Sequence, residues 1–238
     1  MSYKPETIAK VVKNLKEKVA YFRAEIASGN NPTRVRISDG NKKIGKVLNV
    51  SLAPILTCGN CKECKGYCYD IKACNQYKNV TAARAYNTAL LTIDRNVYFG
   101  SIRYKISKRR KNKFFRWHVA GDIVDLGYFA EMVKIAREFP KFVFWTYTKM
   151  YRIVNMYCEL NGKESIPDNL HIMFSKWDGL PMDNPYKFPV FACKLKAGNV
   201  DTSEDWFAKV YKCPGNCDLC KEKKLGCIGG IDTYADEH

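Results

Sequence analysis

The sequence contains no run of eighteen apolar residues, so it offers no segment suited to spanning a membrane. No apolar signal segment follows Met1, and the eleven cysteines are an odd number in a chain of 238 residues. Both features argue against a secreted protein held by disulfide bonds, and they predict a cytoplasmic protein with no membrane partner. Histidine is scarce too: His118, His171 and His238 are the only three, and none belongs to a cysteine-rich segment.

Acidic residues are outnumbered, since 24 Asp and Glu face 40 Lys and Arg and leave a formal net charge of +16. Such a charge favours anionic partners, and we expect a nucleotide or a nucleic acid. Hydrophobic residues make up 46% of the chain, which is enough for a real core. The length suits one compact unit with two parts, an N-terminal helix and β-hairpin over residues 1–53 and an α/β domain over residues 54–238.

Nine of the eleven cysteines fall in two short segments. The first cysteine group has the pattern C-x2-C-x2-C-x3-C and consists of Cys58, Cys61, Cys64 and Cys68, with Cys74 as a substitute ligand. The second cysteine group has the pattern C-x3-C-x2-C-x6-C and consists of Cys213, Cys217, Cys220 and Cys227. Spacings of two or three residues let a tight turn aim successive thiolates at one point, as a tetrahedral zinc ion or a cubane iron–sulfur cluster requires.

The choice of metal needs more than spacing. Three closely placed cysteines with a fourth available and no histidine favour one or two 4Fe–4S clusters, while paired C-x2-C units are also typical of structural zinc sites. The simplest division is two separate four-cysteine centres, and the rival is a single cluster with ligands from both ends of the chain. Cys158 and Cys193 stand alone.

Periodicity predicts the order of elements along the chain. We expect helices over residues 5–28, 80–106, 125–139 and 150–160 and strands over 34–38, 46–52, 114–119, 142–147, 170–175 and 188–193. The first two strands should form the hairpin, and the later ones should alternate with helices in a partial (β/α) barrel-like parallel sheet with cysteine-rich metal-binding loops. Pro189 suggests that the last strand lies at an edge.

A basic run separates the second helix from the strand at 114–119. It contains Lys108, Arg109, Arg110 and Lys111, which could bind phosphates of a nucleic acid or simply form an exposed loop.

Polar residues follow the carboxyl ends of the predicted parallel strands, where ligands bind in α/β folds. His118, Asp122 and Lys149 are the candidates for acid–base catalysis, and Gly121, Thr146, Thr148 and Ser175 are the candidates for holding a cofactor or ligand. The alternatives are structural, because a carboxylate such as Asp122 often caps a helix and a lone histidine in an apolar strand is often a core residue.

Several motifs together resemble the bacteriophage gene-product-88 family over residues 44–227. They are Thr57-Cys58, Gly66-Tyr-Cys-Tyr69, Arg116-Trp-His-Val-Ala-Gly-Asp122, Phe144-Trp-Thr-Tyr-Thr-Lys149 and Cys213-Pro with Cys217 and Cys220. The resemblance implies a phage-encoded protein that acts in the cytoplasm of the infected bacterium, and it supplies no reaction.

The order of loops is also similar to that of radical S-adenosylmethionine enzymes, which have a cysteine loop after the first strand of a partial barrel. That resemblance implies a cluster and S-adenosylmethionine as cofactors. The usual C-x3-C-x2-C motif of those enzymes leaves one iron open, whereas Cys58 to Cys68 offer a fourth thiolate that would close the cluster.

Three functions follow from these patterns. The first is an iron–sulfur protein that binds an anionic ligand and carries out redox or radical chemistry. The second is a non-enzymatic nucleic-acid-binding protein with structural metal sites, and the third is a zinc protein with a hydrolytic or structural role.

Overall fold

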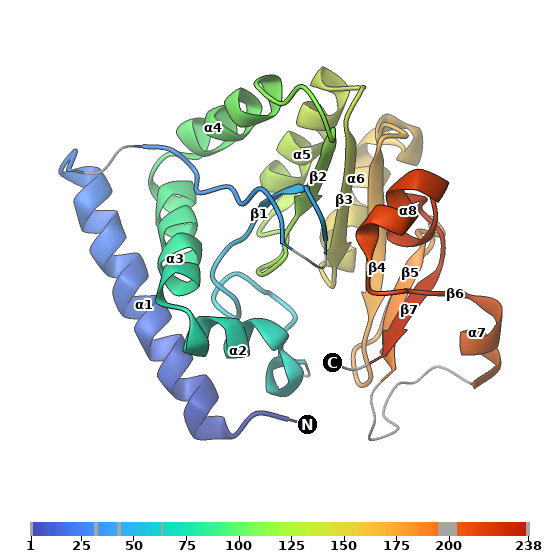
Figure 1. Cartoon of the computed structure of the whole chain (residues 1–238), viewed down its shortest axis with the longest axis horizontal. Coiled ribbons are helices and arrows are strands. Elements are labelled where there is room, and N and C mark those ends of the chain that lie inside the picture. The colour runs from blue at the N-terminus through green and yellow to red at the C-terminus, as the bar shows by residue number, and fades with distance from the viewer. Residues whose placement is uncertain (1, 31–32, 42–43, 63, 195–203, 237–238) are drawn as a thin grey trace.

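The computed structural model describes residues 2–30, 33–41, 44–62, 64–194 and 204–236, so His238 lies outside it (Figure 1). Within these residues, seven parallel strands form one sheet in the order β1-β2-β3-β4-β5-β7-β6. They are β1 (Leu48–Val50), β2 (Phe114–Trp117), β3 (Val143–Thr148), β4 (Leu170–Lys176), β5 (Val190–Lys194), β6 (Tyr211–Lys212) and β7 (Thr233–Asp236). The predicted parallel α/β sheet is confirmed. It is open, with β1 and β6 at its edges, and a barrel is not shown.

The described helices are α1 (Pro5–Ala27), α2 (Tyr69–Gln76), α3 (Lys78–Ile93), α4 (Arg95–Ser107), α5 (Leu126–Glu138), α6 (Tyr151–Asn161), α7 (Glu204–Lys209) and α8 (Cys217–Lys223). Short 3-10 turns are η1 (Lys65–Tyr67), η2 (Lys163–Ser165) and η3 (Gly226–Ile228). The predicted helices at 5–28, 125–139 and 150–160 therefore agree with α1, α5 and α6 to within a residue or two.

The sheet is buried on both faces, as parallel strands usually are. Neighbouring residues of β3 show the alternation, because Phe144 packs into the main core while Trp145 packs into a smaller cluster with Cys220, Cys227 and Ile228. Helices α5 and α6 cover the main-core face, and α8 and η3 cover the other face (Figure 1). The carboxyl-terminal segment thus lies against the second face of the sheet.

The predicted N-terminal hairpin is wrong in its main feature. Residues 34–38 form no strand, and a single antiparallel bridge joins Ser38 to Asn49. The reason is the buried Asn87 side chain of α3, which accepts a hydrogen bond from the Arg36 N–H at 2.8 Å and donates to the Arg36 and Ser51 carbonyls at 2.9 and 3.0 Å. A helix side chain therefore takes hydrogen bonds that a hairpin partner would have made.

Two further expectations need correction. The helix predicted at 80–106 is divided, because Asp94 ends α3 and caps α4 by accepting a hydrogen bond from the Val97 N–H at 2.9 Å. The strand containing Pro189 is internal: β5 begins after Pro189 and pairs with β4 on one side and β7 on the other. Pro189 still pairs with β4 through its carbonyl, which accepts a hydrogen bond from the Phe174 N–H at 2.8 Å.

Candidate functional site

Asp122 is the centre of the polar group at the carboxyl edge of the sheet, the edge where the parallel strands end. Its carboxylate accepts hydrogen bonds from the Thr148 hydroxyl at 2.6 Å, the Lys149 N–H at 2.9 Å and its neighbour, the Ile123 N–H, at 2.7 Å. Asp122 is buried, with 7% of its surface exposed. Burial raises the pKa of Asp122, and these three hydrogen bonds oppose that change.

Gly121 brings this carboxylate close to the segment that follows β1. Its φ of +81° is in the left-handed region, and a Cβ there would lie 2.7 Å from the Leu52 Cβ and 2.7 Å from the Thr57 Oγ1. Only glycine allows this close approach without a shift of neighbours. The predicted ligand residue Gly121 therefore acts through backbone packing beside the first cysteine group.

Lys149 and Ser175 form the second part of the polar group. The Lys149 ammonium donates to the Ser175 hydroxyl at 3.2 Å and lies 5.4 Å from the centre of the Trp177 ring. Tyr151 donates to the Ser175 carbonyl. A cation and a hydroxyl at one point are groups that bind anionic oxygens, so this pair is the part of the site suited to an anion.

His118 and Thr146 lie elsewhere, in the core beneath α5. The His118 ring nitrogens contact the Thr146 hydroxyl at 3.3 Å and the Tyr128 hydroxyl at 3.0 Å. Burial, followed by the nearby Arg116 charge, lowers the pKa of His118 to about 3, so the ring is neutral at pH 7. The structure therefore brings Asp122, Thr148, Lys149 and Ser175 together and places His118 and Thr146 in a separate hydrogen-bonded chain.

The first cysteine group borders the carboxyl edge. The Asn60 amide, between Cys58 and Cys61, donates to the Lys149 carbonyl at 2.7 Å. The Cys58 thiol interacts electrostatically with Asp122 and with the thiols of Cys61 and Cys68, and the Cys68 thiol interacts with Cys64. Burial raises the pKa of Cys58, and it raises that of Cys68 to about 11. At neutral pH the Cys58 and Cys68 thiols stay protonated unless something supplies positive charge.

The second cysteine group lies on the α8 face of the sheet. Cys213 follows β6, Cys217 and Cys220 belong to α8, and Cys227 belongs to η3. Their thiols interact electrostatically with one another, and the Cys220 sulfur lies 3.8 Å from the Tyr211 hydroxyl. Each cysteine group is therefore gathered in space, and they occupy different parts of the molecule.

The thiols do not converge on a single ion. Within the described residues, no three His, Cys, Asp or Glu side chains surround a position that would hold one metal ion, and no disulfide joins two cysteines. A mononuclear zinc site needs four sulfurs at about 2.3 Å from one centre. The described residues thus show no preformed site for a metal ion, and the iron–sulfur cluster stays a prediction from the sequence.

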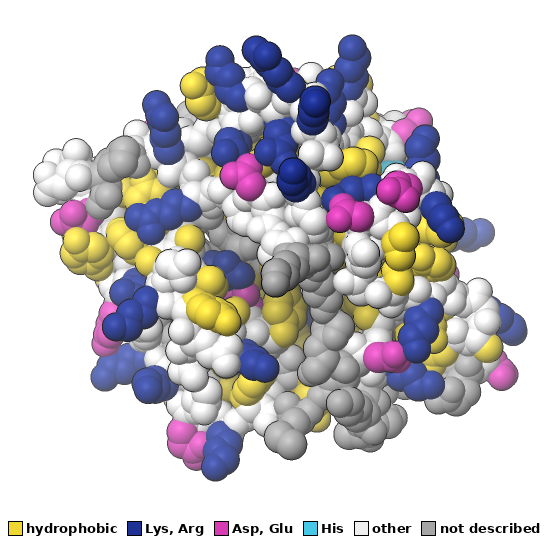
Figure 2. Space-filling view, in the orientation of Figure 1, with side chains coloured by type: hydrophobic (Ala, Val, Ile, Leu, Met, Phe, Trp, Pro, Cys, Tyr) yellow, Lys and Arg dark blue, Asp and Glu magenta, His cyan; other side chains and the backbone are white. Residues whose placement is uncertain are grey.

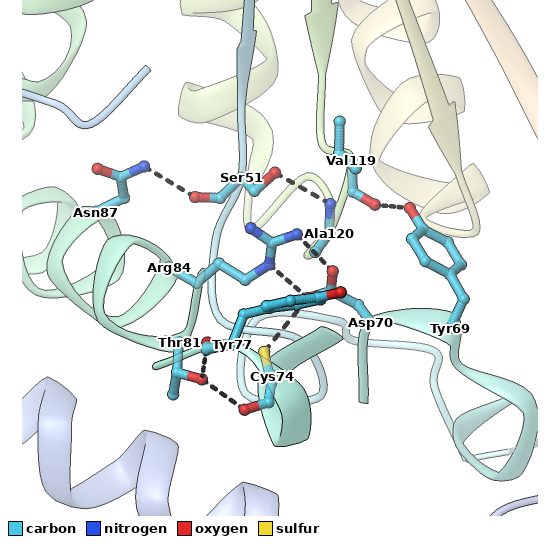
Figure 3. A network of polar contacts seen from close by, with 10 residues as sticks. All are labelled: Ser51, Tyr69, Asp70, Cys74, Tyr77, Thr81, Arg84, Asn87, Val119 and Ala120. Atoms are coloured by element: carbon cyan, nitrogen blue, oxygen red, sulfur yellow. Dashed lines mark hydrogen bonds and ion pairs between the residues drawn. The ribbon is translucent and has the colours of Figure 1, made fainter. Parts of the chain in front are cut away.

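Cys74 lies outside the first cysteine group. Its thiol donates to the Asp70 Oδ2 at 3.6 Å, beside the ion pair between Asp70 and Arg84 (Figure 3). Burial and Asp70 raise the pKa of Cys74 to about 12, which keeps it a thiol. The two remaining cysteines, Cys158 and Cys193, lie in α6 and β5.

The basic run lies at the amino edge of the sheet, opposite the carboxyl edge, because it precedes β2 while Asp122 follows it. Lys and Arg side chains gather over α4 and the loop after it, at the top of Figure 2. Lys108, Arg110 and Lys111 are exposed, whereas Arg109 is half-buried and pairs with Asp39 at 3.2 Å. The structure therefore keeps these cations apart from Lys149 and Ser175.

Three neighbours of the cysteine groups are not among the site residues predicted from the sequence: Arg116, Tyr147 and Asn60. Arg116 had a signal, since it is a cation within the apolar strand Phe114-Phe-Arg-Trp117. Asn60 had a weaker one, its position between two cysteines.

The chain matches a known protein family. A family model described as Gene product 88 matches residues 23–183, which includes the first cysteine group and ends before β5 and the second cysteine group. No curated protein and no solved structure matches the chain. The described helices are all too short or too polar to cross a bilayer.

Proposed function

Because this chain belongs to the bacteriophage gene-product-88 family and the family match identifies no reaction, we propose a function from the chain's own residues: an iron–sulfur protein that binds an anionic ligand. The first cysteine group would hold the cluster, and Lys149 with Ser175 would bind the ligand beside it. The observation that carries the proposal is the contact between them: the Asn60 amide, between Cys58 and Cys61, donates to the Lys149 carbonyl at 2.7 Å, and the Lys149 backbone N–H donates to Asp122 at 2.9 Å.

Charge supports a cluster at this position. Four thiolates beside the Asp122 carboxylate would be a costly concentration of negative charge in a buried site. Iron supplies the positive charge that lets thiols ionise and lets the carboxylate remain close. A bound cluster would supply one-electron transfer, and the chain's own residues would position the anionic ligand: Lys149 by its charge, Ser175 by its hydroxyl and Thr148 by fixing Asp122.

Metal content tests the cluster. Protein purified without oxygen should contain about four irons and four sulfides for each 4Fe–4S cluster and should absorb visible light. Replacing Cys58 and Cys61 with serine should remove one cluster, while the control Cys158→Ser, in α6, should keep the full iron content. Colourless protein, or zinc in place of iron, would overturn the proposal.

Ligand binding tests the anion site, with ATP and inorganic phosphate as probes. Lys149→Gln removes a charge-assisted contact worth about 1.5–3 kcal/mol, so we expect ATP affinity to fall by about ten- to a hundredfold. The matched control is Lys141→Gln, which removes the same charge from an exposed residue that precedes β3 at the amino edge. Equal affinities for the two variants would rule out Lys149 as an anion-binding residue.

The amino edge favours a second function, nucleic-acid binding. Lys108, Arg110 and Lys111 are exposed within one short run, and Figure 2 shows cations gathered over this part of the surface. Contacts with phosphates would be independent of sequence and sensitive to salt. This role would be compatible with the first, because the two surfaces lie at opposite edges of the sheet.

A further inference from the structure

Arg116 is a half-buried cation that the proposed function leaves unexplained. It lies in β2 on the face covered by α8, and its guanidinium is 4.9 Å from the centre of the Tyr147 ring. Its Nε atom is buried without a hydrogen-bond partner, and no carboxylate among the described residues forms an ion pair with it. A buried N–H without an acceptor is unfavourable, so this position points to a group that accepts hydrogen bonds, and an anion would also balance the charge.

The groups that face Arg116 identify that anion. The guanidinium lies over the Tyr147 ring, and both Tyr147 and Cys217 pack against the group of buried residues that contains Cys220 and Cys227. Neutral thiols would not compensate its charge, whereas metal-bound thiolates would. A hydroxyl also lies beside one of these sulfurs, since the Tyr211 hydroxyl is 3.8 Å from the Cys220 sulfur.

The two cysteine groups therefore have opposite surroundings. The first lies beside the Asp122 carboxylate, because Gly121 closely approaches Thr57, and the second lies near a guanidinium and the Tyr211 hydroxyl. Metal ligands are commonly held and tuned by such neighbours, and hydrogen bonds to cluster sulfurs are one of the factors that set the reduction potential. Donors and positive charge stabilise the reduced, more negative state of a cluster.

We propose that Cys213, Cys217, Cys220 and Cys227 bind a second iron–sulfur cluster, separate from the first, and that Arg116 is its counter-cation. The inference rests on the proposed function in that it takes iron–sulfur chemistry from it. On one-electron reduction by an external donor, the second cluster gains one negative charge that Arg116 partly balances, and no covalent bond forms or breaks. The second cluster consequently has the higher reduction potential and takes up the first electron.

Iron content of the full chain, purified without oxygen, tests the separate centre. Wild-type protein should contain twice the iron of a variant with Cys217→Ser and Cys227→Ser, and the first-group variant should lose the other half. Full iron in the second-group variant would overturn the second cluster and leave the first intact. Loss of all iron from both variants would indicate one shared cluster, and an iron-free wild type would refute the proposed function itself.

Stepwise reduction with dithionite, followed by electron paramagnetic resonance, tests the role of Arg116. In Arg116→Met the signal of the second cluster should appear at lower potential while that of the first cluster is unchanged, and Arg116→Lys should restore most of the difference. Potentials equal to those of the wild type in both variants would overturn the role of Arg116. If Arg116→Met does not fold, Tyr147→Phe, which removes only the hydroxyl, should shift the same signal in the same direction, and an unchanged potential would count against the proposal.

Discussion

The buried ion pair between Asp70 and Arg84 has a calculable effect on stability (Figure 3). Arg84 donates through Nε and Nη2 to the two carboxylate oxygens of Asp70, and the Cys74 thiol donates to one of them. The side chain of Asp70 is 2% exposed and that of Arg84 is 13% exposed. Asp70 belongs to α2 and Arg84 to α3, so the pair fixes the helix that directly follows the first cysteine group.

Breaking this pair should be strongly destabilising. Asp70→Asn leaves the Arg84 guanidinium buried without a counter-charge, which is expected to lower the free energy of unfolding by about 3–5 kcal/mol. Arg84→Met leaves the Asp70 carboxylate in the same position and should cost a similar amount. The double variant should cost clearly less than the sum, because neither charge then remains unpaired.

Urea unfolding followed by circular dichroism measures these differences. The matched control is Arg95→Met, which breaks a two-point ion pair with Asp125 whose side chains are 40% and 47% exposed. An exposed pair contributes less than about 1 kcal/mol. If Asp70→Asn costs no more than Arg95→Met, or if the double variant costs the full sum, the reasoning about burial and coupling is refuted.

Three other predictions concern single regions. Burial lowers the pKa of His118 in the folded protein to about 3. Between about pH 6.5 and 3 the histidine is therefore protonated in the unfolded chain and neutral in the folded one, so the free energy of unfolding falls with falling pH by up to about 1.36 kcal/mol per pH unit. His118→Gln should flatten this slope in urea titrations. Asp122→Asn should cost about 1–3 kcal/mol in thermal melts, because an amide N–H would face a backbone N–H, and an unchanged melting temperature would contradict the described hydrogen bonds. Replacing Lys108, Arg110 and Lys111 with Gln should reduce the slope of log affinity for single-stranded DNA against log salt by about 0.7 for each lost phosphate contact, and an unchanged slope would exclude this surface.

The sequence predicts elements whose signal is local. The apolar positions of α1 and α5 recur at helical spacing, and the strands β2, β3 and β4 are short apolar runs that end in polar residues. Because parallel strands end at the same edge, the gathering of Asp122, Lys149 and Ser175 could also be predicted.

What the sequence could not predict depends on partners distant in the chain. No hairpin forms because Asn87, which lies on a helix 51 residues after Arg36, takes the backbone hydrogen bonds of Arg36. Pro189 does not mark an edge because β7 and β6 follow later and extend the sheet beyond β5. His118 shares its hydrogen bonds with Tyr128 and Thr146, neither of which its neighbours in the sequence reveal.

The basic run precedes β2 and Asp122 follows it, so the two lie at opposite ends of the strands. Charges at one end therefore have little electrostatic effect on groups at the other. The neighbouring strand β3 has six residues, which corresponds to about 20 Å from one edge to the other. At physiological ionic strength charges are screened over about 8 Å, so the exposed cations of the amino edge act on molecules in solution and leave the proton affinity of Asp122 unaltered. A surface tag or an immobilising anion at Lys111 should therefore leave the carboxyl edge open and electrostatically unchanged.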